Sequence, residues 1–451
     1  MTRHPASYRD PSGFVYHSAG RLYRQVNKVY AGDYNRLMQS GLYHMLCEQN
    51  LLLRHKEINE NIRNDSDWHI TLLPEQIPFT SYPSEWCFEQ LKDAALLTLR
   101  VAKIAIAKGM MLKDATAFNI QFIHGRPVFI DTLSFEKYNP SMPWVAYRQF
   151  CETFLFPLMI AHYDKMGIVP LMQGFAEGIP VHTAAKLLPY KSRFNAAAWL
   201  HVYLQNKFSN KHPAAASPVS FSEKKMMNLL NHLESTVERL SNFSKSPWRD
   251  YYAESVPGTD YLQAKEKIVT AYLQKINGKH LLDLGANDGH FSILATKSGF
   301  DVIAIDNDEQ CINSFYKKTK AENITGVLPL CINIISPTPA TGFANKERSS
   351  FEERIKPDAL MALALLHHLC IGKNIPLEML AGYFARLAPQ LIIEFVAKED
   401  EKTQLLLQNK KDIFPSYSIA RFEEIFSEKF VIENKEMAGD TRRSIYFMKR
   451  R

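Results

Sequence analysis

The second half of the chain alternates short apolar runs with stretches of helical periodicity. Near-continuous apolar strands separated by helices are typical of a parallel sheet that is covered on both faces. The pattern therefore predicts an α/β domain with a Rossmann-like, doubly wound, mostly parallel sheet. We expect its strands at residues 280–284, 302–306, 327–335, 359–366 and 391–395. Two further runs, 430–432 and 444–448, predict an antiparallel pair at the edge of this sheet.

The first half of the chain follows a different pattern. Residues 13–26 have the glycine and aromatic spacing of a β-hairpin, and residues 121–131 predict a second hairpin that turns at Gly125. Helical periodicity covers residues 34–55, 85–108 and 144–207. Strands followed by helices that do not alternate regularly indicate an α+β domain.

A change in composition separates the two halves. Residues 210–222 contain small residues and two prolines, which is typical of a linker. Behind Ser222, a candidate N-cap, apolar residues repeat at helical spacing as far as Leu240. We therefore divide the chain into an N-terminal domain at 1–210, a linker with an amphipathic helix at 211–250, and a C-terminal domain at 251–451.

Composition and charge narrow the class of protein. The 451 residues are 46% hydrophobic and 22% charged, with a formal net charge of +7, so the chain is not mostly disordered. Its six cysteines are scattered without a Cys-x-x-Cys motif, and we expect them to be buried thiols in a reducing compartment. No apolar run approaches the roughly 20 residues that a membrane span needs. We expect a cytoplasmic protein with no membrane span.

The loop after the first strand of the second half carries the most informative motif. Residues 283–289 read D-L-G-A-N-D-G, so Gly285 and Gly289 bracket a turn between a strand and a helix. Glycine lets the backbone approach a ligand closely, and amide groups at a helix start can face its polar atoms. Asp306 ends the next strand, where a carboxylate can accept both hydroxyls of a ribose. The pattern favours an adenosine-containing ligand over a dinucleotide, which would need G-x-G-x-x-G.

This D-x-G-x-N-x-G motif and the following strand-end acid resemble motifs I and II of class I S-adenosylmethionine-dependent methyltransferases. The resemblance covers roughly residues 250–451 and implies S-adenosylmethionine as the cofactor. It implies that Asp283 holds the methionine amino end, that Asp306 binds the ribose diol, and that Asn333 contacts the adenine amine. The implied cofactor-binding residues are Asp283, Gly285, Asn287, Gly289, Asp306 and Asn333. An NAD-binding or non-catalytic Rossmann-like domain is the alternative interpretation.

The later strands indicate where the methyl acceptor would lie. His367 and His368 follow the fourth strand, at the sheet edge where such folds bind ligands, and histidine is a natural base for a hydroxyl. Glu394 lies inside an apolar strand, where a carboxylate needs a partner or a place at the crevice. These three are the candidate catalytic residues. Alternatively both histidines are structural and the glutamate is the buried partner of an arginine, namely Arg421, Arg442 or Arg443.

Other features bear on the acceptor and on access to the site. The Asn-Pro-Pro-Tyr motif of amino-directed methyltransferases and a metal-binding E-x-x-H motif are both absent, which favours an oxygen or carbon acceptor and no metal. The basic clusters lack the interleaved aromatic residues of RNA-binding motifs. We expect a small-molecule or glycan-like acceptor rather than nucleic acid, with a cofactor-sensing binding protein as the alternative. Aromatic residues ahead of the first strand are candidates for a lid: Trp248, Tyr251, Tyr252 and Tyr261.

A second constellation lies in the first half of the chain. Asp114, Asn119 and Asp131 form a D-x4-N-x11-D pattern on a loop, a hairpin start and a strand end. The pattern resembles the catalytic loop and metal-binding aspartate of kinase-like phosphotransferases, including the aminoglycoside type. The resemblance implies that Asp114 orients or deprotonates a hydroxyl, while Asn119 and Asp131 hold Mg-ATP. Because the histidine of the catalytic loop and the strand lysine are missing, the alternative is a degenerate domain that recognises substrate.

Overall fold

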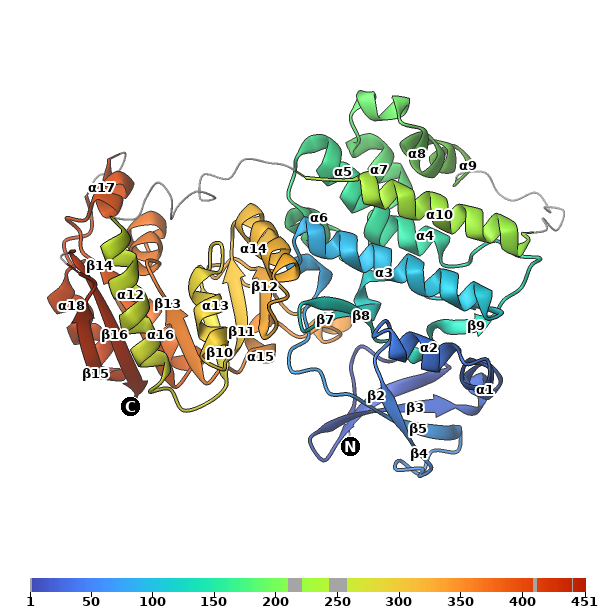
Figure 1. The fold of residues 1–451 in the computed structure, drawn as a ribbon, viewed down its shortest axis with the longest axis horizontal. Helices are drawn as coiled ribbons and strands as arrows, with labels where there is room; N and C mark the ends of the chain where they lie inside the picture. The colour runs from blue at the N-terminus through green and yellow to red at the C-terminus, as the bar shows by residue number, and fades with distance from the viewer. Residues whose placement is uncertain (1, 210–220, 243–257, 409–411, 440) are drawn as a thin grey trace. The chain divides into compact units, whose positions relative to one another are not determined.

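The computed structural model describes residues 2–209, 221–242, 258–408, 412–439 and 441–451. The chain forms two compact units. Figure 1 shows the helices and strands, coloured by residue number. The first unit comprises Met1–Ser244 and Ala340–Ser349, and the second comprises Lys245–Pro339 and Ser350–Arg451. A short segment from the second half of the chain is thus part of the first unit. Residues 211–220 and 243–250 of the predicted linker lie outside the described residues.

Among the described residues, the first unit begins with a five-stranded antiparallel sheet in the order β1-β2-β3-β5-β4. The hairpin predicted over 13–26 is confirmed as β2 and β3. The helix predicted over 34–55 is wrong in part, because two helices separated at Gly41 precede strand β4. Gly41 has a φ of 73°, a left-handed conformation that ends a helix. The elements are β1 (Thr2–Arg3), β2 (Gly13–Ser18), β3 (Arg21–Asn27), α1 (Ala31–Gln39), α2 (Leu42–Glu48), β4 (His55–Ile58) and β5 (Trp68–Pro74).

The rest of the first unit is mainly helical, as predicted. The long helix α3 (Phe88–Ala107) is followed by two two-stranded antiparallel sheets, β6-β9 and the hairpin β7-β8, and then by a series of helices. The predicted hairpin turn at Gly125 is confirmed, with φ values of 50° at His124 and 75° at Gly125. The strands are β6 (Met110–Leu112), β7 (Ile120–Ile123), β8 (Arg126–Phe129) and β9 (Phe135–Lys137). The helices are α4 (Tyr147–Phe150), α5 (Phe156–Asp164), α6 (Ile168–Gly174), α7 (Val181–Leu187), α8 (Ala196–Ala198), α9 (Gln205–Ser209) and α10 (Glu223–Arg239).

Helix α10, the amphipathic helix of the predicted linker, is packed into the first unit. Ser222 occupies its N-cap position, as expected. Its apolar face is buried, and on its polar side Glu234 pairs with Lys103 of α3 at 2.5 Å. Lys92 of α3 donates to the carbonyls of Glu238 and Leu240 at the end of α10. The helix is therefore part of the first unit's core and not a free connector.

The described part of the second unit is built on a seven-stranded sheet in the order β12-β11-β10-β13-β14-β16-β15. The first five strands in this order are parallel, and β16 runs antiparallel between β14 and β15. Both the doubly wound α/β sheet and the antiparallel pair at its edge are confirmed. The strands are β10 (His280–Leu284), β11 (Asp301–Asp306), β12 (Val327–Cys331), β13 (Ala359–Ala362), β14 (Gln390–Val396), β15 (Phe430–Met437) and β16 (Arg443–Arg450).

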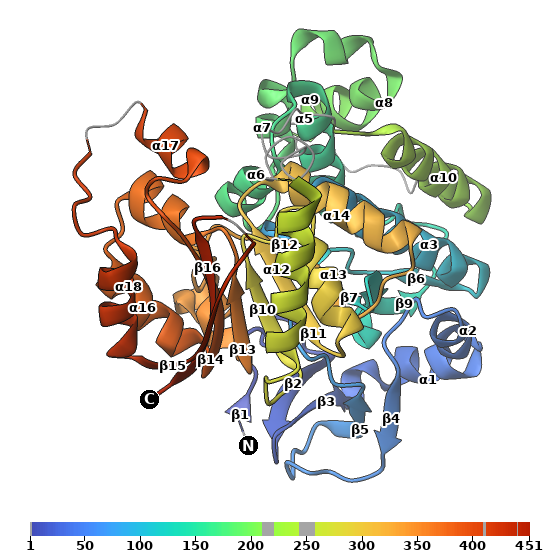
Figure 2. The ribbon, with the colours of Figure 1, turned by 60° about the vertical axis from the view of Figure 1, so that its left-hand side comes forward.

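Helices cover both faces of this sheet, which explains why its inner strands, such as β13 and β14, are buried and mainly apolar (Figure 2). Helices α12, α13 and α14 lie on one face, where Leu281, Met361 and Phe447 contribute to a buried core. Helices α16 and α18 lie on the other face, where Phe422 contacts Phe395 and Tyr446. The helices are α12 (Gly258–Leu273), α13 (His290–Lys297), α14 (Glu309–Ala321), α15 (Phe351–Arg354), α16 (Leu377–Leu387), α17 (Glu401–Leu407) and α18 (Ile419–Ser427).

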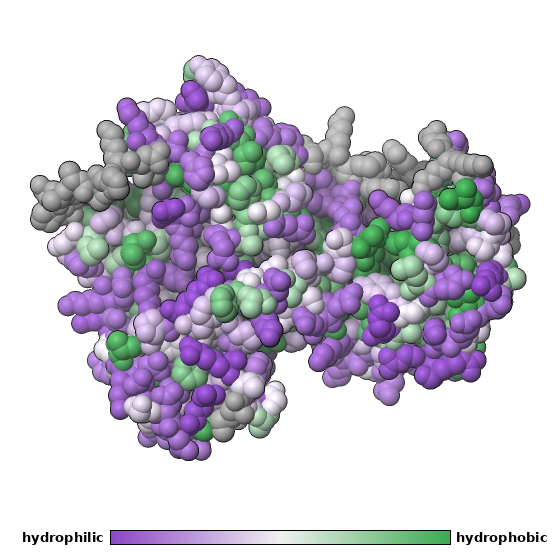
Figure 3. Space-filling view, turned by 180° about the vertical axis from the view of Figure 1, so that it is seen from behind, coloured by the Kyte–Doolittle hydropathy of each residue, from purple (hydrophilic) through white to green (hydrophobic). Residues whose placement is uncertain are grey.

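Surface and core properties agree with the composition of a globular protein. The face shown in Figure 3 is mostly hydrophilic, with hydrophobic side chains in small patches. In the part of the chain that the structure describes, no helix has both the length and the apolar character needed to cross a bilayer. The cysteines are buried free thiols, as expected: Cys47, Cys87, Cys151, Cys311, Cys331 and Cys370.

Candidate functional site

The glycine loop of the second unit is joined directly to the acid at the end of the neighbouring strand. Strand β10 ends at Leu284, and the chain turns through Gly285 (φ 72°) and Asn287 (φ 52°) before α13 begins. The Asp306 carboxylate accepts the backbone N–H of Asn287 at 2.9 Å and that of Asp308 at 2.8 Å. Since β10 and β11 are parallel neighbours, their carboxyl ends meet at one edge of the sheet. The sequence motif therefore forms one connected site at that edge.

Glycine is needed at the two positions of the loop for different structural reasons. A Cβ atom on Gly285 would lie 3.2 Å from Leu365, in the loop that follows β13. A Cβ atom on Gly289 would lie 2.1 Å from the ring of Phe315 on α14. Both glycines also have a positive φ. Gly289 is thus required by internal packing, whereas Gly285 lies where two strand-end loops approach each other.

Asn287 contributes an unused acceptor to this edge. Within the described residues, its side-chain amide oxygen is buried and has no hydrogen-bond partner. A buried polar atom without a partner is costly, and native proteins rarely keep one without a ligand or water to satisfy it. Its left-handed backbone conformation, tolerated best by asparagine among residues with a side chain, holds it there. Asn287 therefore marks a place for a hydrogen-bond donor.

The acids at the site are held by neutral donors. Asp283 is buried, and the Ser292 hydroxyl on α13 donates to its carboxylate at 2.5 Å. Burial raises the pKa of Asp283 to about 7, with a further contribution from the Asp306 charge. Burial also raises the pKa of Asp306, against the two backbone donors, which lower it. Asp283 contacts α13 beneath the loop, while half-buried Asp306 supports the loop itself.

Asn333 shapes the turn after β12. Its side-chain oxygen accepts the N–H of Ile335 at 3.0 Å, and its carbonyl accepts the N–H of Ser336 at 2.9 Å. The preceding residue, Ile332, donates its N–H to the Asp306 carbonyl at 3.0 Å. Because of this turn, β12 ends at Cys331, earlier than the predicted 327–335. Asn333 thus lies at the same sheet edge as Asp306.

The two histidines follow a strained bend after β13. That strand ends at Ala362, shorter than predicted, and Ala364 has a φ of 50°, which is uncommon for alanine. His367 is fully buried, and neither ring nitrogen has a partner among the described residues. Burial, with His368 and the nearby cations of Arg443 and Lys265, lowers the pKa of His367 well below its usual value. Burial lowers the pKa of His368 to about 4, so both rings are neutral near pH 7.

Glu394 lies at the centre of a buried network. Its carboxylate accepts the hydroxyl of Tyr261 and the ammonium of Lys265, both on α12, at 2.6 Å each. Arg443 on β16 donates to the Tyr261 hydroxyl at 3.0 Å and forms a two-pronged pair with Asp400 at 2.8 and 3.1 Å. Burial acts to raise the pKa of Glu394, but the Lys265 and Arg443 cations outweigh it, so the pKa is lowered. Both carboxylate oxygens are therefore engaged and ionised.

Neither Lys265 nor Asp400 is among the residues predicted from the sequence. The sequence instead suggests an arginine as the alternative ion-pair partner of Glu394, whereas the structure shows that this partner is Lys265. A usable signal was present, because Lys265 lies one helical turn from Tyr261 on the apolar face of α12. A lysine on a buried face needs an acid opposite it. Among the lid candidates, Tyr261 is a buried member of the network. Trp248, Tyr251 and Tyr252 lie outside the described residues.

The three polar residues singled out in the first unit also come together. Asn119 hydrogen-bonds Asp114, and its side-chain N–H group donates to Ser134 at 3.3 Å. The Ser134 hydroxyl in turn donates to Asp131, which forms an ion pair with Arg24 on β3. Burial raises the pKa of Asp114, and the Asp131 charge adds to this. The loop, the hairpin start and the strand end of the predicted pattern thus form one cluster with an arginine.

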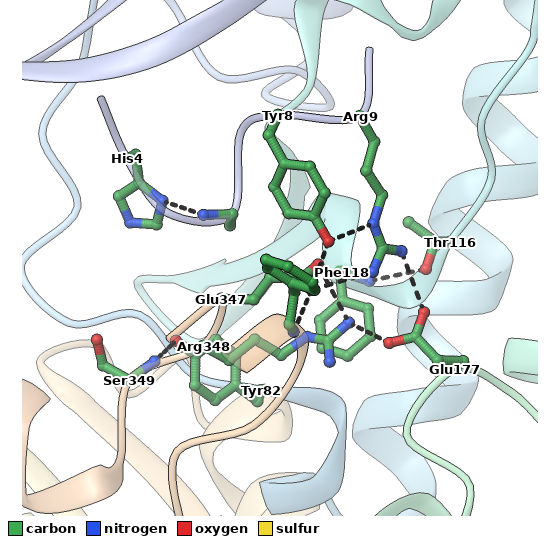
Figure 4. Close-up of polar contacts among 12 residues, drawn as sticks. His4, Tyr8, Arg9, Tyr82, Thr116, Phe118, Glu177, Glu347, Arg348 and Ser349 are labelled. Atoms are coloured by element: carbon green, nitrogen blue, oxygen red, sulfur yellow. Dashed lines mark hydrogen bonds and ion pairs between the residues drawn. The ribbon is translucent and has the colours of Figure 1, made fainter. Parts of the chain in front are cut away.

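Residues 340–349 contact the loop between Asp114 and Asn119 from the outside (Figure 4). The guanidinium of Arg348 lies 4.0 Å from the ring centre of Phe118 and pairs with Glu177 at 2.8 Å. Buried Glu347 accepts from Arg9 at 3.0 Å. A stacked cation and two ion pairs therefore hold this segment in the first unit.

The strand order, the antiparallel β16 and the glycine loop joined to a strand-end acid define the second unit as a class I methyltransferase fold. The whole chain is similar to nodulation protein NoeA of Rhizobium meliloti (strain 1021). The two are 30% identical over 463 residues, which cover 98% of this chain and 95% of the relative. The chain belongs to the NoeA family.

No protein-family model matches the chain. Among solved structures, magnesium protoporphyrin IX methyltransferase (ChlM) from Synechocystis PCC 6803 with bound SAH is 18% identical, with a TM-score of 0.33. That match covers 45% of this chain and 92% of the other. The bifunctional kinase-methyltransferase WbdD is 13% identical, with a TM-score of 0.29, over 45% of this chain and 41% of the other.

Proposed function

We propose that the second unit transfers a methyl group from S-adenosylmethionine to an oxygen or carbon atom of a small-molecule or glycan-like acceptor. The observation that carries this proposal is the connection between Asp306 and the N–H of Asn287, beside an amide oxygen that has no partner in the described chain. A carboxylate and an unpaired amide oxygen at the carboxyl edge of a parallel sheet suit a ligand with a ribose diol and a cationic end.

The residues present fit this cofactor. Each oxygen of the Asp306 carboxylate accepts one backbone N–H and keeps further acceptor capacity for a hydroxyl. The unpaired oxygen of Asn287 can accept from an ammonium or hydroxyl group. Asp283 holds α13 against the loop through its hydrogen bond with Ser292. When bound, S-adenosylmethionine supplies an activated methyl group on a sulfonium centre.

His367 is the residue we assign to the acceptor. Both nitrogens of the His367 imidazole are unpaired among the described residues, so one of them can accept the proton that an acceptor hydroxyl loses as its oxygen takes the methyl group. His368 is also neutral and lies with its ring centre 4.1 Å from that of His367. Glu394 is a positioning residue, because both of its oxygens are engaged by Tyr261 and Lys265.

Cofactor binding tests the proposal. We expect S-adenosylhomocysteine to raise the Tm of the full chain and NAD to leave it unchanged, since the loop lacks a pyrophosphate fingerprint. In calorimetry, Asp306→Ala should weaken S-adenosylhomocysteine binding at least about 100-fold, the loss expected for two charge-assisted hydrogen bonds. Asp301→Ala, at the exposed opposite end of the same strand, is the matched control. Equal affinity of the Asp306 variant and wild type would refute the cofactor site.

Transfer activity distinguishes an enzyme from a cofactor-sensing protein. Labelled methyl groups from S-adenosylmethionine should enter the small-molecule or glycan fraction of a cell extract. His367→Asn should slow this incorporation at least about 100-fold, the loss of one general base, without weakening cofactor binding. His280→Asn, on an exposed histidine at the start of β10, should behave as wild type. Tight cofactor binding without any incorporation would favour the sensing interpretation.

A second candidate function concerns the first unit, where Asp114, Asn119 and Asp131 form one cluster with Arg24. This arrangement suits a Mg²⁺-bound nucleotide phosphate, as the kinase-like resemblance implies. We expect Mg²⁺-dependent stabilisation of the full chain by ATP, lost in Asp131→Asn and kept in Asp164→Asn, a change at an exposed residue that ends α5. Absence of any Mg²⁺-dependent response would leave substrate recognition as the role of this unit.

A further inference from the structure

One stretch of the first unit combines positive charge with a complete lack of acids. Between residues 178 and 209 there are four basic residues and no aspartate or glutamate, a formal charge of +4, whereas the whole chain carries +7. The stretch runs from α7 through a 3-10 turn at Tyr190–Phe194 to α8 and α9, which lie together at one end of the unit (Figures 1 and 2). All four basic side chains are exposed: Lys186, Lys191, Arg193 and Lys207.

The same stretch exposes large apolar and aromatic side chains. Phe194 is 82% exposed and Tyr190 is 71% exposed. The other members are Leu187, Trp199, Leu200 and Phe208. Leaving side chains of this size in water forfeits the stabilisation that burial provides, and a concentration of them marks an interaction surface. We name residues 186–208, with these basic and apolar side chains, the basic-aromatic surface.

Basic and apolar residues are adjacent throughout this surface. Lysine or arginine stands next to an exposed apolar residue at Lys186–Leu187, Tyr190–Lys191, Arg193–Phe194 and Lys207–Phe208. The rings of Tyr190 and Phe194 lie 5.8 Å apart, and Arg193 lies 5.3 Å from the Tyr190 ring centre. The charges and rings around the 3-10 turn therefore form one small surface and are not scattered over the unit.

We propose that the basic-aromatic surface binds the interfacial region of a bilayer that contains anionic lipids. Tyrosine and tryptophan rings favour the headgroup level of a membrane, phenylalanine and leucine favour the acyl boundary, and lysine and arginine pair with lipid phosphates. The stretch itself contributes no carboxylate that anionic headgroups would repel. Such binding is peripheral and needs no spanning helix.

Charge also argues against a second copy of the chain as the occupant. A two-fold contact through the same surface would place four basic residues against four identical ones, with no acid to compensate them. The proposal is independent of methyl transfer and of nucleotide binding, because none of the residues involved belongs to either candidate site.

Vesicle binding by the full chain tests the proposal. In co-sedimentation, the protein should bind phosphatidylcholine vesicles that contain phosphatidylglycerol, bind pure phosphatidylcholine weakly, and lose binding as salt rises. Lys191→Gln with Arg193→Gln should weaken binding to the anionic vesicles by about fivefold for each charge removed. Phe194→Ser with Trp199→Ser should weaken it at least about tenfold, from the loss of inserted apolar area. Because these side chains are exposed, the Tm of each variant should stay at the wild-type value.

Matched variants elsewhere on the surface make the result specific. Lys356→Gln with Lys429→Gln removes two exposed charges, and Met379→Ser with Ile413→Ser removes two exposed apolar side chains. Both should bind vesicles as wild type does. Three results would overturn the proposal: no binding to anionic vesicles at low salt, equal losses in the control pairs, or tighter binding to an oligonucleotide than to vesicles. Dimerisation abolished by the Phe194 and Trp199 changes, without vesicle binding, would instead assign the surface to self-association.

Discussion

The two units hold their aspartates in opposite ways. In the first unit, Asp131 beside Asp114 is neutralised by an ion pair with Arg24. In the second unit, Asp283 and Asp306 are held by a hydroxyl and by backbone amides, and their pKa values are raised. The negative charge of Asp131 is thus already compensated by a cation of the chain. A carboxylate that is held by a hydroxyl or by backbone amides keeps a net charge that no cation of the chain neutralises. It can therefore still accept hydrogen bonds from the hydroxyl groups of a ligand, or attract a cationic group.

Removing the buried cation Lys265 from the second unit should have the largest effect. Lys265→Ala removes the cation that contacts the buried Glu394 carboxylate and leaves one of its oxygens without a donor, which costs about 3 kcal/mol in the free energy of unfolding. Urea unfolding measures this loss. Lys267→Ala, exposed on the same helix, should change the free energy by less than about 0.5 kcal/mol. The double change Lys265→Met with Glu394→Leu should recover most of the loss. A single variant as stable as wild type would show that the ion pair contributes nothing.

The raised pKa of Asp283 predicts that the free energy of unfolding depends on pH, with an effect of comparable size. Because its pKa rises from 3.8 to about 7 on folding, the folded state keeps a proton that the unfolded state releases. The contribution of Asp283 to stability is thus present at low pH and is lost as pH rises from about 4 to about 7, by at most about 4 kcal/mol. Asp283→Asn should remove this slope from urea unfolding series, whereas Asp301→Asn should keep it. Parallel wild-type and Asp283→Asn series would contradict the raised pKa.

The first unit provides the converse test. Arg24→Gln leaves the Asp131 carboxylate without its ion-pair partner and should cost about 2 kcal/mol. The loss should be greater at neutral than at acid pH, because repulsion between Asp131 and Asp114 requires both to be ionised. Arg21→Gln, exposed on the same strand, is the control. Equal free energies of unfolding for the two arginine variants would show that Arg24 does not compensate the charge of Asp131.

The smallest effect is expected in the segment at residues 340–349. Arg348→Ala removes the contact with the Phe118 ring and the ion pair with Glu177, together worth about 1 kcal/mol. Proteolytic cleavage within this segment should become faster, because its opening is less costly. Lys346→Ala, an exposed neighbour, should be cleaved at the wild-type rate. Unchanged cleavage of the Arg348 variant would mean that other contacts hold the segment.

Local sequence signals predicted much of the second unit. The apolar runs located β10, β11 and β14 almost to the residue, and the glycine spacing located the loop that Asp306 fastens. Predictions failed where a single backbone conformation decided the outcome. Gly41 divides the first helical stretch, and Ala364 ends β13 early. A hydrophobic pattern does not record such positive φ values unless a glycine happens to mark them.

What the sequence alone determined about this protein was its pattern of buried faces, its α+β and α/β halves, and the candidate site at residues 283–306. Only the tertiary structure decided which distant charges meet. Lys265 pairs with Glu394, and residues 340–349 join the first unit. The physical reason is that periodicity along the chain encodes which face of an element is buried, whereas an ion pair depends on how separate elements pack in space.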